Sequence, residues 1–284
     1  MKAFSFTKLS GAGNDFILFD CKLNPDLKLS SELIQKICER RKGIGADGVL
    51  VISDLDGYAF DMKYFNADGS SGVLCANGAR CALKYGSISG RVNQRIVKFK
   101  ANNVDYSGIV LDDNNIKFFF NSPKKLKYNF KVKAAGQLIT ASFVDTGAPH
   151  LVIKTNDILE YPAKPDSFYK NIDDLPVYQF GKELRYSPDF APDGTNVNFI
   201  QIENGEIIIR TYERGVENET LACGTGSVAA ALISYVNDKL MPPIKLNVKS
   251  GDVLKVDFKI EDQKVRDLSL TGPAEVIFNG ELSI

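Results

Sequence analysis

The chain contains no tryptophan and a single histidine, His150, in 284 residues. One histidine cannot complete a Cys/His zinc site, and the five cysteines include no Cys-x-x-Cys pair, so we expect no metal. No apolar run approaches the roughly 18 residues of a membrane-spanning helix. Residues 1–8 alternate like a strand and lack the apolar core of a signal peptide. These absences predict a cytoplasmic protein with no membrane partner.

The chain also lacks an excess of charge of either sign. Lys plus Arg and Asp plus Glu are both 35, which gives a formal net charge of +0. A balanced chain gives no electrostatic reason to bind nucleic acid or an acidic membrane surface. The length suits one large or two modest domains. The sequence leaves open whether the chain forms a homodimer.

Two of the five cysteines stand in an unusual setting. Cys75 and Cys223 lie about half the chain apart, and each opens a stretch of small residues that runs into a helical pattern. A thiol at a helix N-terminus lies in a positive local field and ionises more easily. Two such thiols, one from each half, suit the movement of a proton from one face of a carbon to the other. We expect Cys21, Cys38 and Cys81 to be small buried residues without disulfides.

The order of predicted elements repeats in the two halves. The pattern predicts a helix that Ser30 opens and Gly43 ends, a strand over 58–65, a helix over 75–85 closed by Gly86, and strands near 95–100, 103–111 and 115–120. Residues 122–125 are the best candidate linker. Thr146-Gly-Ala then echoes Ser10-Gly-Ala, residues 195–200 echo 47–52, and the segment after Cys223 echoes the one after Cys75. Three echoes in one order indicate a duplicated unit.

Further segments of the second half complete this prediction. Residues 154–193 are rich in Pro and Asp and predict a surface excursion with short helical turns. Residues 227–236 are apolar or small throughout, which is typical of a buried helix. Strands are expected near 244–249, 252–260 and 265–270, and residues 274–278 are expected to return to the first domain.

The fold class is therefore α/β, of the α+β type. We expect two pseudo-symmetric domains, each a mostly antiparallel sheet wrapped around a central helix, with the active site in the cleft between them. The first domain is expected over 1–121 plus 273–284 and carries Cys75, and the second over 122–272 carries Cys223.

Eight short motifs follow one another in a fixed order along the chain. They are residues 10–16 (SGAGNDF), 41–48 (RKGIGADG), 65–70 (FNADGS), 75–80 (CANGAR), 147–150 (GAPH), 194–199 (GTNVNF), 210–215 (RTYERG) and 220–226 (TLACGTG). Each is weak alone, but the whole set closely resembles the diaminopimelate epimerase family. The resemblance implies an epimerase that interconverts LL- and meso-diaminopimelate in lysine and cell-wall precursor biosynthesis. It also implies catalysis without pyridoxal phosphate, metal or another cofactor.

The resemblance assigns roles to individual side chains. It implies that Cys75 and Cys223 are a thiolate and thiol pair, with His150 serving one and Glu213 the other in an unassigned pairing. It places Arg214 on the carboxylate of the non-reacting end, where a planar guanidinium makes paired hydrogen bonds. Further substrate contacts are implied for Asn14, Asn66 and Asn196, and for the residues at the two helix N-termini, Ala76, Asn77, Gly224 and Thr225.

Three departures from the family pattern bear on recognition of the distal end. Ala148 stands where family members often have Asn, and Ala76 stands where Gly is common. The segment 216–219 is one residue longer than expected. These differences affect the expected contacts, not the reaction type.

Three other interpretations compete with this one. A proline or hydroxyproline type racemase of the same fold also uses two cysteines, but its substrate has no distal charged end for Arg214 to bind. A non-catalytic amino-acid-binding relative would have no need of both thiols together with His150 and Glu213. A phenazine-biosynthesis isomerase would lack the cysteine pair.

Overall fold

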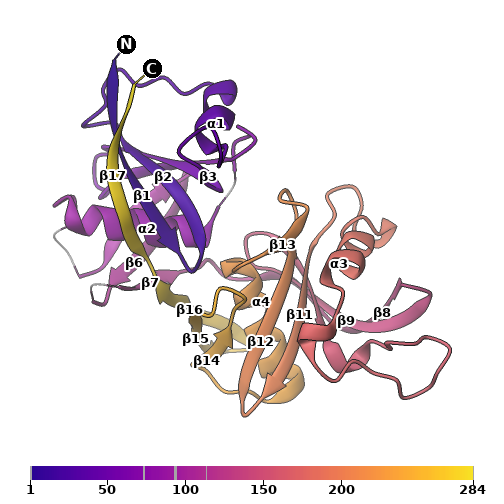
Figure 1. The fold of residues 1–284 in the computed structure, drawn as a ribbon. Helices are drawn as coiled ribbons and strands as arrows, with labels where there is room; N and C mark the ends of the chain where they lie inside the picture. Colours follow the sequence, from indigo (N-terminus) through magenta and orange to yellow (C-terminus); the bar gives the residue numbers. More distant parts are fainter. Residues whose placement is uncertain (1, 73, 93–94, 113, 284) are drawn as a thin grey trace. The chain divides into compact units, whose positions relative to one another are not determined.

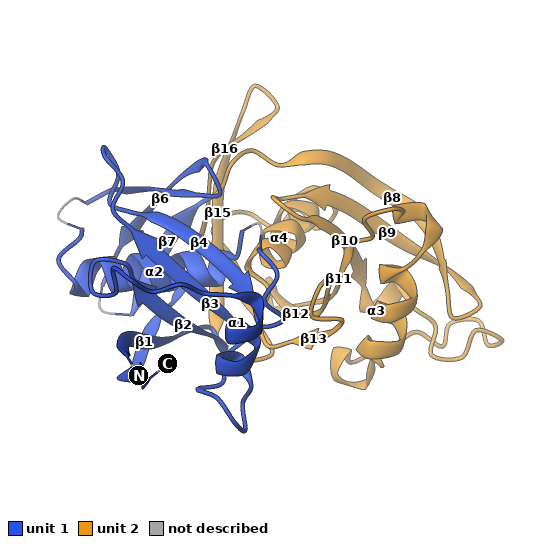
Figure 2. Ribbon diagram, turned by 90° about the horizontal axis from the view of Figure 1, so that it is seen from above, with its two compact units in different colours: residues 1–119, 271–284 blue, residues 120–270 orange. Residues whose placement is uncertain are grey.

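The computed structural model describes residues 2–72, 74–92, 95–112 and 114–283, and it divides into two compact units. Unit 1 comprises residues 1–119 and 271–284, and unit 2 comprises residues 120–270 (Figure 2). The chain therefore passes from one unit to the other twice, the second time within a strand. That the chain forms two domains over 1–121 plus 273–284 and over 122–272 stays a prediction.

Unit 1 is a sheet built from both ends of the chain. Its strands are β1 (Ala3–Gly11), β2 (Asn14–Asp20), β3 (Gly48–Ser53), β4 (Asp61–Asn66), β5 (Val97–Ala101), β6 (Val104–Val110), β7 (Asn115–Phe119) and β17 (Glu275–Ser283). β17 lies antiparallel to β1, with Ala3 opposite Ser283, so the two termini lie side by side (Figure 1). The predicted return of the last segment to the first half is confirmed.

The helix α2 (Ala76–Ile88) is the centre of unit 1. It contacts β1, β2, β6 and β7, and its residues from Ala76 to Leu83 are buried. The unit has a second, shorter helix, α1 (Ser31–Cys38). Ser30 is its N-cap, and the Ser30 hydroxyl accepts a hydrogen bond from the backbone N–H of Leu33. Unit 1 is thus a sheet around a buried helix, as the fold class predicts.

Unit 2 follows the same plan. Its strands are β8 (Lys124–Ala134), β9 (Gln137–Asp145), β10 (Pro149–Lys154), β11 (Asn196–Glu203), β12 (Glu206–Glu213), β13 (Asn218–Thr220), β14 (Ile244–Asn247), β15 (Val253–Glu261) and β16 (Lys264–Pro273), the end of which enters unit 1. The helix α4 (Gly224–Asp238) contacts β9, β10, β11 and β12 and is buried from Gly224 to Ser234. The prediction of a buried apolar helix here is confirmed.

Strand pairing confirms the duplication. In unit 1, β2 runs parallel to β3, β3 antiparallel to β4, β4 parallel to β5, and β5 antiparallel to β6. In unit 2, the strands β10, β11, β12, β14 and β15 pair in the same sequence of parallel and antiparallel steps. Equivalent steps place a cysteine-capped helix after β4 and after β12, so Cys75 and Cys223 occupy corresponding positions.

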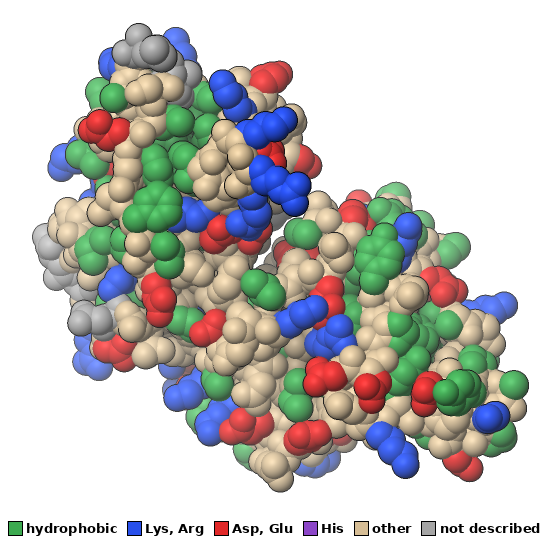
Figure 3. Space-filling view, viewed as in Figure 1, with side chains coloured by type: hydrophobic (Ala, Val, Ile, Leu, Met, Phe, Trp, Pro, Cys, Tyr) green, Lys and Arg blue, Asp and Glu red, His purple; other side chains and the backbone are tan. Residues whose placement is uncertain are grey.

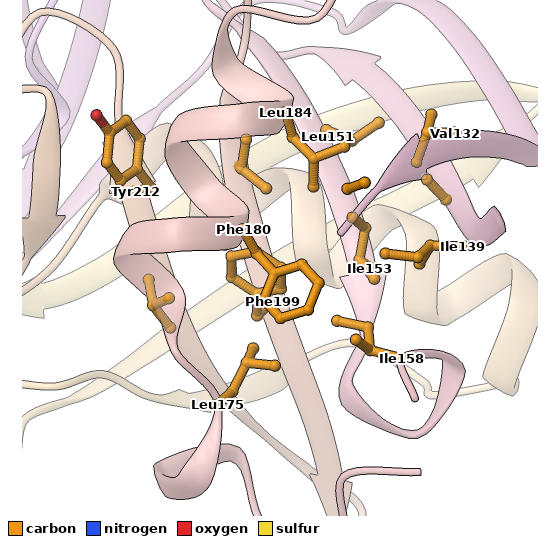
Figure 4. Packing of buried hydrophobic residues seen from close by; sticks show 14 of the residues in the cluster. Val132, Ile139, Leu151, Ile153, Ile158, Leu175, Phe180, Leu184, Phe199 and Tyr212 are labelled. Carbon is orange, nitrogen blue, oxygen red and sulfur yellow. The ribbon is translucent and has the colours of Figure 1, made fainter. Parts of the chain in front are cut away.

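The excursion over 154–193 is not confined to the surface, which corrects the prediction. Besides short 3₁₀ turns it forms α3 (Val177–Arg185), a helix of 9 residues. Phe180 and Leu184 lie one turn apart on α3 and pack into the core of unit 2 with Leu151 and Phe199 (Figure 4). Because this face is apolar, α3 covers the sheet and completes the core.

Two helix ends also differ from prediction. α1 ends at Cys38 rather than near Gly43, because Glu39 is extended, with ψ 120°, and the chain turns back along the helix. Gly86 does not close α2 but lies inside it. A Cβ there would meet Val92 Cγ2 at 2.8 Å and Phe60 at 3.3 Å, so close packing rather than helix termination requires this glycine.

The surface carries charges of both signs. On the face in view in Figure 3, acidic side chains lie near basic ones in both units. Exposed ion pairs such as Lys245–Glu206 and Lys259–Asp267 contribute to this pattern. This mixed surface agrees with the balanced composition.

Candidate functional site

Cys75 is the N-cap of α2, with φ −113° and ψ 109°. Its sulfur accepts a hydrogen bond from the backbone N–H of Gly78, at 3.4 Å, and donates to Asn14 Oδ1, at 3.5 Å. The sulfur thus lies within hydrogen-bond distance of one donor and one acceptor. The half-buried side chain therefore has one polar partner from its own helix and one from β2.

A charged network holds the amide of Asn14 in this orientation. Asn14 Nδ2 donates to Asp47 Oδ2 at 2.7 Å, and an ionised carboxylate can only accept, so Asn14 Oδ1 faces Cys75. Arg40 pairs with Asp47 at 2.6 Å and with Asp15 at 2.8 Å. Lys8, almost fully buried, pairs with Asp15 at 2.7 Å. Burial acts to raise the pKa of Asp15, but the hydrogen bonds from Arg40 and Lys8 outweigh it and lower that pKa to about 2.

The other predicted contacts of unit 1 lie in two places. Ala76 and Asn77 form the first turn of α2 and are 3% and 2% exposed, and Asn77 Nδ2 donates to Asn14 Oδ1 at 3.3 Å. Asn66 lies at the end of β4, in a turn where its Nδ2 donates to Ser70 Oγ at 2.9 Å. The structure therefore brings Asn14, Asn77 and Cys75 into contact, and it gives Asn66 a turn partner.

Cys223 caps α4 with φ −118° and ψ 111°, nearly the backbone conformation of Cys75. Its side chain is 6% exposed, and its sulfur lies 3.5 Å from Thr225 Oγ1. Gly224 and Thr225 form the buried start of the helix. Gly226 leaves room for Asn198, because a Cβ at this position would lie 2.2 Å from Asn198 Oδ1.

His150 lies on β10 and is 0% exposed. Its Nε2 lies 2.8 Å from Thr225 Oγ1, and its Nδ1 lies 3.1 Å from Asn198 Nδ2. Burial, with repulsion from Arg214, lowers the pKa of His150 to about 3. The imidazole is therefore neutral at physiological pH, and it reaches Cys223 through the hydroxyl of Thr225.

Arg214 follows the end of β12 and borders a cavity in unit 2. The cavity has a volume of ≈ 690 Å³, and Lys127, Asp145 and Asp193 also line it. Asn196, only 4% exposed, holds the backbone of Arg214 by accepting its N–H at Oδ1, and it donates from Nδ2 to the carbonyl of Pro149. A guanidinium at the wall of a cavity can bind a carboxylate with two parallel hydrogen bonds.

Glu213 ends β12, and its Oε2 accepts a hydrogen bond from the Thr220 hydroxyl at 3.0 Å. Two ion pairs fix the segment between these two residues. Glu217 pairs with Arg185 at 3.1 Å, and Glu219 with Arg210 at 2.7 Å. The segment forms a structured turn that leads into β13.

The remaining cysteines agree with the expectation in two of three cases. Cys38 and Cys81 are buried, and burial raises the pKa of both thiols, to about 11 for Cys38. Cys21 is only half-buried, which corrects the prediction, because the chain turns at the surface directly after β2. All five cysteines are free thiols.

Known proteins match this arrangement along almost the whole chain. The model of a family described as diaminopimelate epimerase matches residues 6–124 and 142–277. The chain belongs to the diaminopimelate epimerase family. It is 36% identical to the diaminopimelate epimerase of Chlorobaculum tepidum, over 97% of this chain and 100% of that protein. It is 33% identical to that of Aquifex aeolicus, over 98% of this chain and 97% of that protein. Membership of this family makes the chain an isomerase.

Solved structures show the fold. A phenazine biosynthesis protein of the PhzF family from Bacillus anthracis superposes with a TM-score of 0.73, at 14% identity and over 100% of both chains. A hydroxyproline epimerase from Agrobacterium vitis superposes with a TM-score of 0.71, at 10% identity, over 99% of this chain and 93% of that one. The chain therefore shares its fold with a hydroxyproline epimerase and with a protein of the PhzF family.

Two kinds of feature are absent from the part of the chain that the structure describes. No group of three or more His, Cys, Asp or Glu side chains there is placed to hold a metal ion. Within the same residues, no helix has both the length and the apolar character to cross a membrane.

Sequence reasoning missed residues that support the two cysteines. Asn198, on β11, contacts His150, and Asp47 with Arg40 orients Asn14. A signal for Asn198 was available, because Asn is rare in buried strands and a buried amide needs partners. No sequence signal was available for Arg40, because Arg40 comes close to Asp15 and Asp47 only when α1 ends at Cys38.

Proposed function

We propose that this member of the diaminopimelate epimerase family interconverts LL- and meso-diaminopimelate through two-base catalysis by Cys75 and Cys223. The observation that carries the proposal is that both cysteines are the N-cap residue of the buried central helix of a repeated unit, with almost the same backbone conformation. A pair of equivalent thiols suits a reaction whose forward and reverse directions exchange the roles of acid and base.

The chemistry follows from the demands of an α-carbon. A thiolate removes the α-proton from one face while the opposite thiol delivers its proton to the other face. One S–H bond and one C–H bond form while one of each breaks, so the protonation states of the two sulfurs are exchanged after each turnover. A thiol has an ordinary pKa of about 8.5, which a helix N-terminus can lower toward neutral pH. The reaction needs no redox partner.

The carbanion that develops places negative charge on the substrate carboxylate. Backbone N–H groups at the start of a helix point outward and carry partial positive charge. Ala76 and Asn77 in α2, with Gly224 and Thr225 in α4, supply such groups beside the two cysteines. We propose that these N–H groups stabilise the charge as an oxyanion hole does.

Recognition of the distal end rests on Arg214. Its guanidinium borders the cavity in unit 2, and Asn196 fixes its backbone. We propose that it binds the carboxylate of the non-reacting end, with Asn66 and Asn196 close to that stereocentre. Glu213 is proposed as the carboxylate that serves one thiol, and His150 serves the other.

The test is incubation of LL-diaminopimelate with the enzyme in deuterated water, followed by NMR and chiral chromatography. Two bases deliver solvent deuterium to the product while the remaining substrate keeps its proton early in the reaction. One base would label substrate and product alike, which would contradict the cysteine pair. Proline and hydroxyproline serve as comparison substrates, and inversion of either of them with no change in diaminopimelate would overturn the proposed substrate. Binding of diaminopimelate without exchange would support the non-catalytic alternative.

A further inference from the structure

A line of four polar side chains in unit 2 connects Asn198 to Cys223. Asn198 Nδ2 lies 3.1 Å from His150 Nδ1, His150 Nε2 lies 2.8 Å from Thr225 Oγ1, and Thr225 Oγ1 lies 3.5 Å from Cys223 Sγ. Asn198 and His150 are 0% exposed, so neither exchanges these partners for bulk water. The direction of each hydrogen bond is therefore set by the protein.

The direction begins at Asn198, whose amide can be oriented in only one way. Its Nδ2 lies 2.9 Å from the carbonyl oxygen of Leu151, which can only accept, so this atom is the NH₂ group. Its Oδ1 accepts from the Thr211 hydroxyl at 3.0 Å, which agrees. The remaining N–H of Asn198 points to His150 Nδ1, and that ring nitrogen must accept.

The ring proton of the neutral imidazole is then on Nε2. Nε2–H donates to Thr225 Oγ1, which takes up one acceptor position of the hydroxyl. The single hydroxyl proton of Thr225 is left to donate in another direction, and Cys223 Sγ lies on that side. A hydrogen bond donated to sulfur stabilises the thiolate relative to the thiol.

We propose that Asn198 is a positioning residue for Cys223: it holds the Nε2–H tautomer of His150, so that the hydroxyl of Thr225 donates to the Cys223 sulfur and favours its thiolate. This inference rests on the proposed function only in the use of that thiolate for catalysis. The hydrogen-bond directions and their effect on the thiol exist without substrate.

The two cysteines differ in this respect. The partner of Cys75 outside its own helix is Asn14 Oδ1, an acceptor, whereas the partner of Cys223 is a hydroxyl that the chain of hydrogen bonds turns into a donor. Cys75 thus serves as an internal reference, because a change at Asn198 should leave its reactivity as it is.

The first experiment reads the tautomer directly. Because His150 is the only histidine, the ¹⁵N imidazole spectrum of the labelled enzyme has one pair of ring signals. The wild type should show neutral Nε2–H. In Asn198→Asp the carboxylate can only accept, so the ring should switch to Nδ1–H, and Nε2 should then take the hydroxyl proton of Thr225 from Cys223. An Nδ1–H tautomer in the wild type would overturn the proposal.

The second experiment measures the pKa of Cys223 without substrate. The alkylation rate by iodoacetamide is followed against pH, and peptide mass spectrometry separates Cys223 from Cys75. Thr225→Val removes the hydroxyl and should slow alkylation of Cys223 near neutral pH by about tenfold, a pKa rise of about one unit. Thr225→Ser keeps the hydroxyl and should restore the rate. Equal rates in Thr225→Val and wild type would contradict the proposal, and this pair of variants remains decisive should Asn198→Asp fail to fold.

A double-mutant cycle separates two effects of Asn198→Asp on Cys223. One acts through the hydrogen-bond chain of Asn198, His150 and Thr225, which we call the relay, and the other is the direct effect of the added charge. If Asn198 acts through Thr225, Asn198→Asp should raise the pKa of Cys223 in the wild-type background and have no further effect in Thr225→Val. Additive effects would show that the new carboxylate acts through space and would reject the relay. Epimerisation of diaminopimelate tests the proposed function separately. If the wild type epimerises diaminopimelate while the two substitutions change the pKa of Cys223 additively, the relay is rejected and the proposed function stands.

Discussion

The side-chain oxygen of Asn196 accepts a hydrogen bond from the backbone N–H of Arg214 at 2.9 Å. The same amide donates to the carbonyl of Pro149, so one buried side chain connects the start of β10 to the end of β12. The residue before His150 and the proposed anchor of the distal carboxylate are therefore held by a single amide. This connection explains why the polar side chain of Asn196 is buried.

Asn196→Asp should weaken this connection while nearly preserving shape. The carboxylate can still accept from Arg214, but it turns an acceptor toward the Pro149 carbonyl, and an unsatisfied buried group costs about 1–3 kcal/mol. We expect lower resistance to urea and a KM for diaminopimelate raised about tenfold. Asn204→Asp, in an exposed turn after β11, is the matched control and should change neither quantity. Wild-type KM in Asn196→Asp would show that the position of Arg214 does not depend on this amide.

The cysteine pair predicts equal importance of the two thiols. Cys75→Ala and Cys223→Ala should each lower kcat for epimerisation on the order of 10³-fold or more, because each variant lacks the acid or the base. Circular dichroism and thermal unfolding should stay close to wild type. Cys21→Ser, at a half-buried thiol of unit 1, should retain activity. Near-normal turnover in either of the first two variants would reject two-base catalysis.

Sequence patterns captured the parts of the fold that local chemistry determines. Cys75 and Cys223 were found because a cap followed by small residues and a helical pattern is a local signal. The repeat and the return of β17 were found because strand alternation is likewise local. α3 was missed because its buried pair, Phe180 and Leu184, lies in a segment whose Pro and Asp content is typical of loops. Gly86 was misread because its role is a contact with Val92 and Phe60 from other parts of the chain.

The same division applies to the candidate site. The helix caps, His150 and Arg214 carry visible motifs, whereas their supporting contacts join distant segments. Lys8, Asp15, Arg40 and Asp47 meet only because α1 ends at Cys38 and the chain turns back. No spacing in the sequence encodes that arrangement, since each pair depends on the strand pairing of β1, β2 and β3.

The buried imidazole of His150 predicts the pH dependence of stability. Burial lowers its folded pKa to about 3, and the unfolded value is about 6.5, so the unfolded chain binds more protons between these values. The contribution is fully present above about pH 6.5 and is lost as pH falls toward 3, by about 1.4 kcal/mol per pH unit. Urea unfolding of wild type and His150→Gln between about pH 5 and pH 8 isolates this slope. The imidazole signal of the folded wild type should not titrate in that range, and a midpoint near 6.5 would contradict its burial as a neutral group.

Arg214 should control the choice of substrate. Loss of the guanidinium leaves a distal carboxylate without its cation, at a cost of roughly 2–5 kcal/mol in binding. We expect Arg214→Ala to raise KM for diaminopimelate strongly, and Arg214→Lys to rescue it only in part, because an ammonium cannot form two parallel hydrogen bonds with a carboxylate. Arg266→Ala, at an exposed arginine of β16, is the control and should behave like wild type.

The decisive comparison for Arg214 uses lysine, which has the same α-amino-acid end as diaminopimelate but no distal carboxylate. Wild type should invert diaminopimelate far faster than lysine at equal concentration, and Arg214→Ala should reduce that preference by weakening only the reaction of diaminopimelate. If wild type treats both substrates alike, or if Arg214→Ala keeps the wild-type preference, the guanidinium does not hold the distal carboxylate, and a racemase of simpler amino acids becomes the better interpretation.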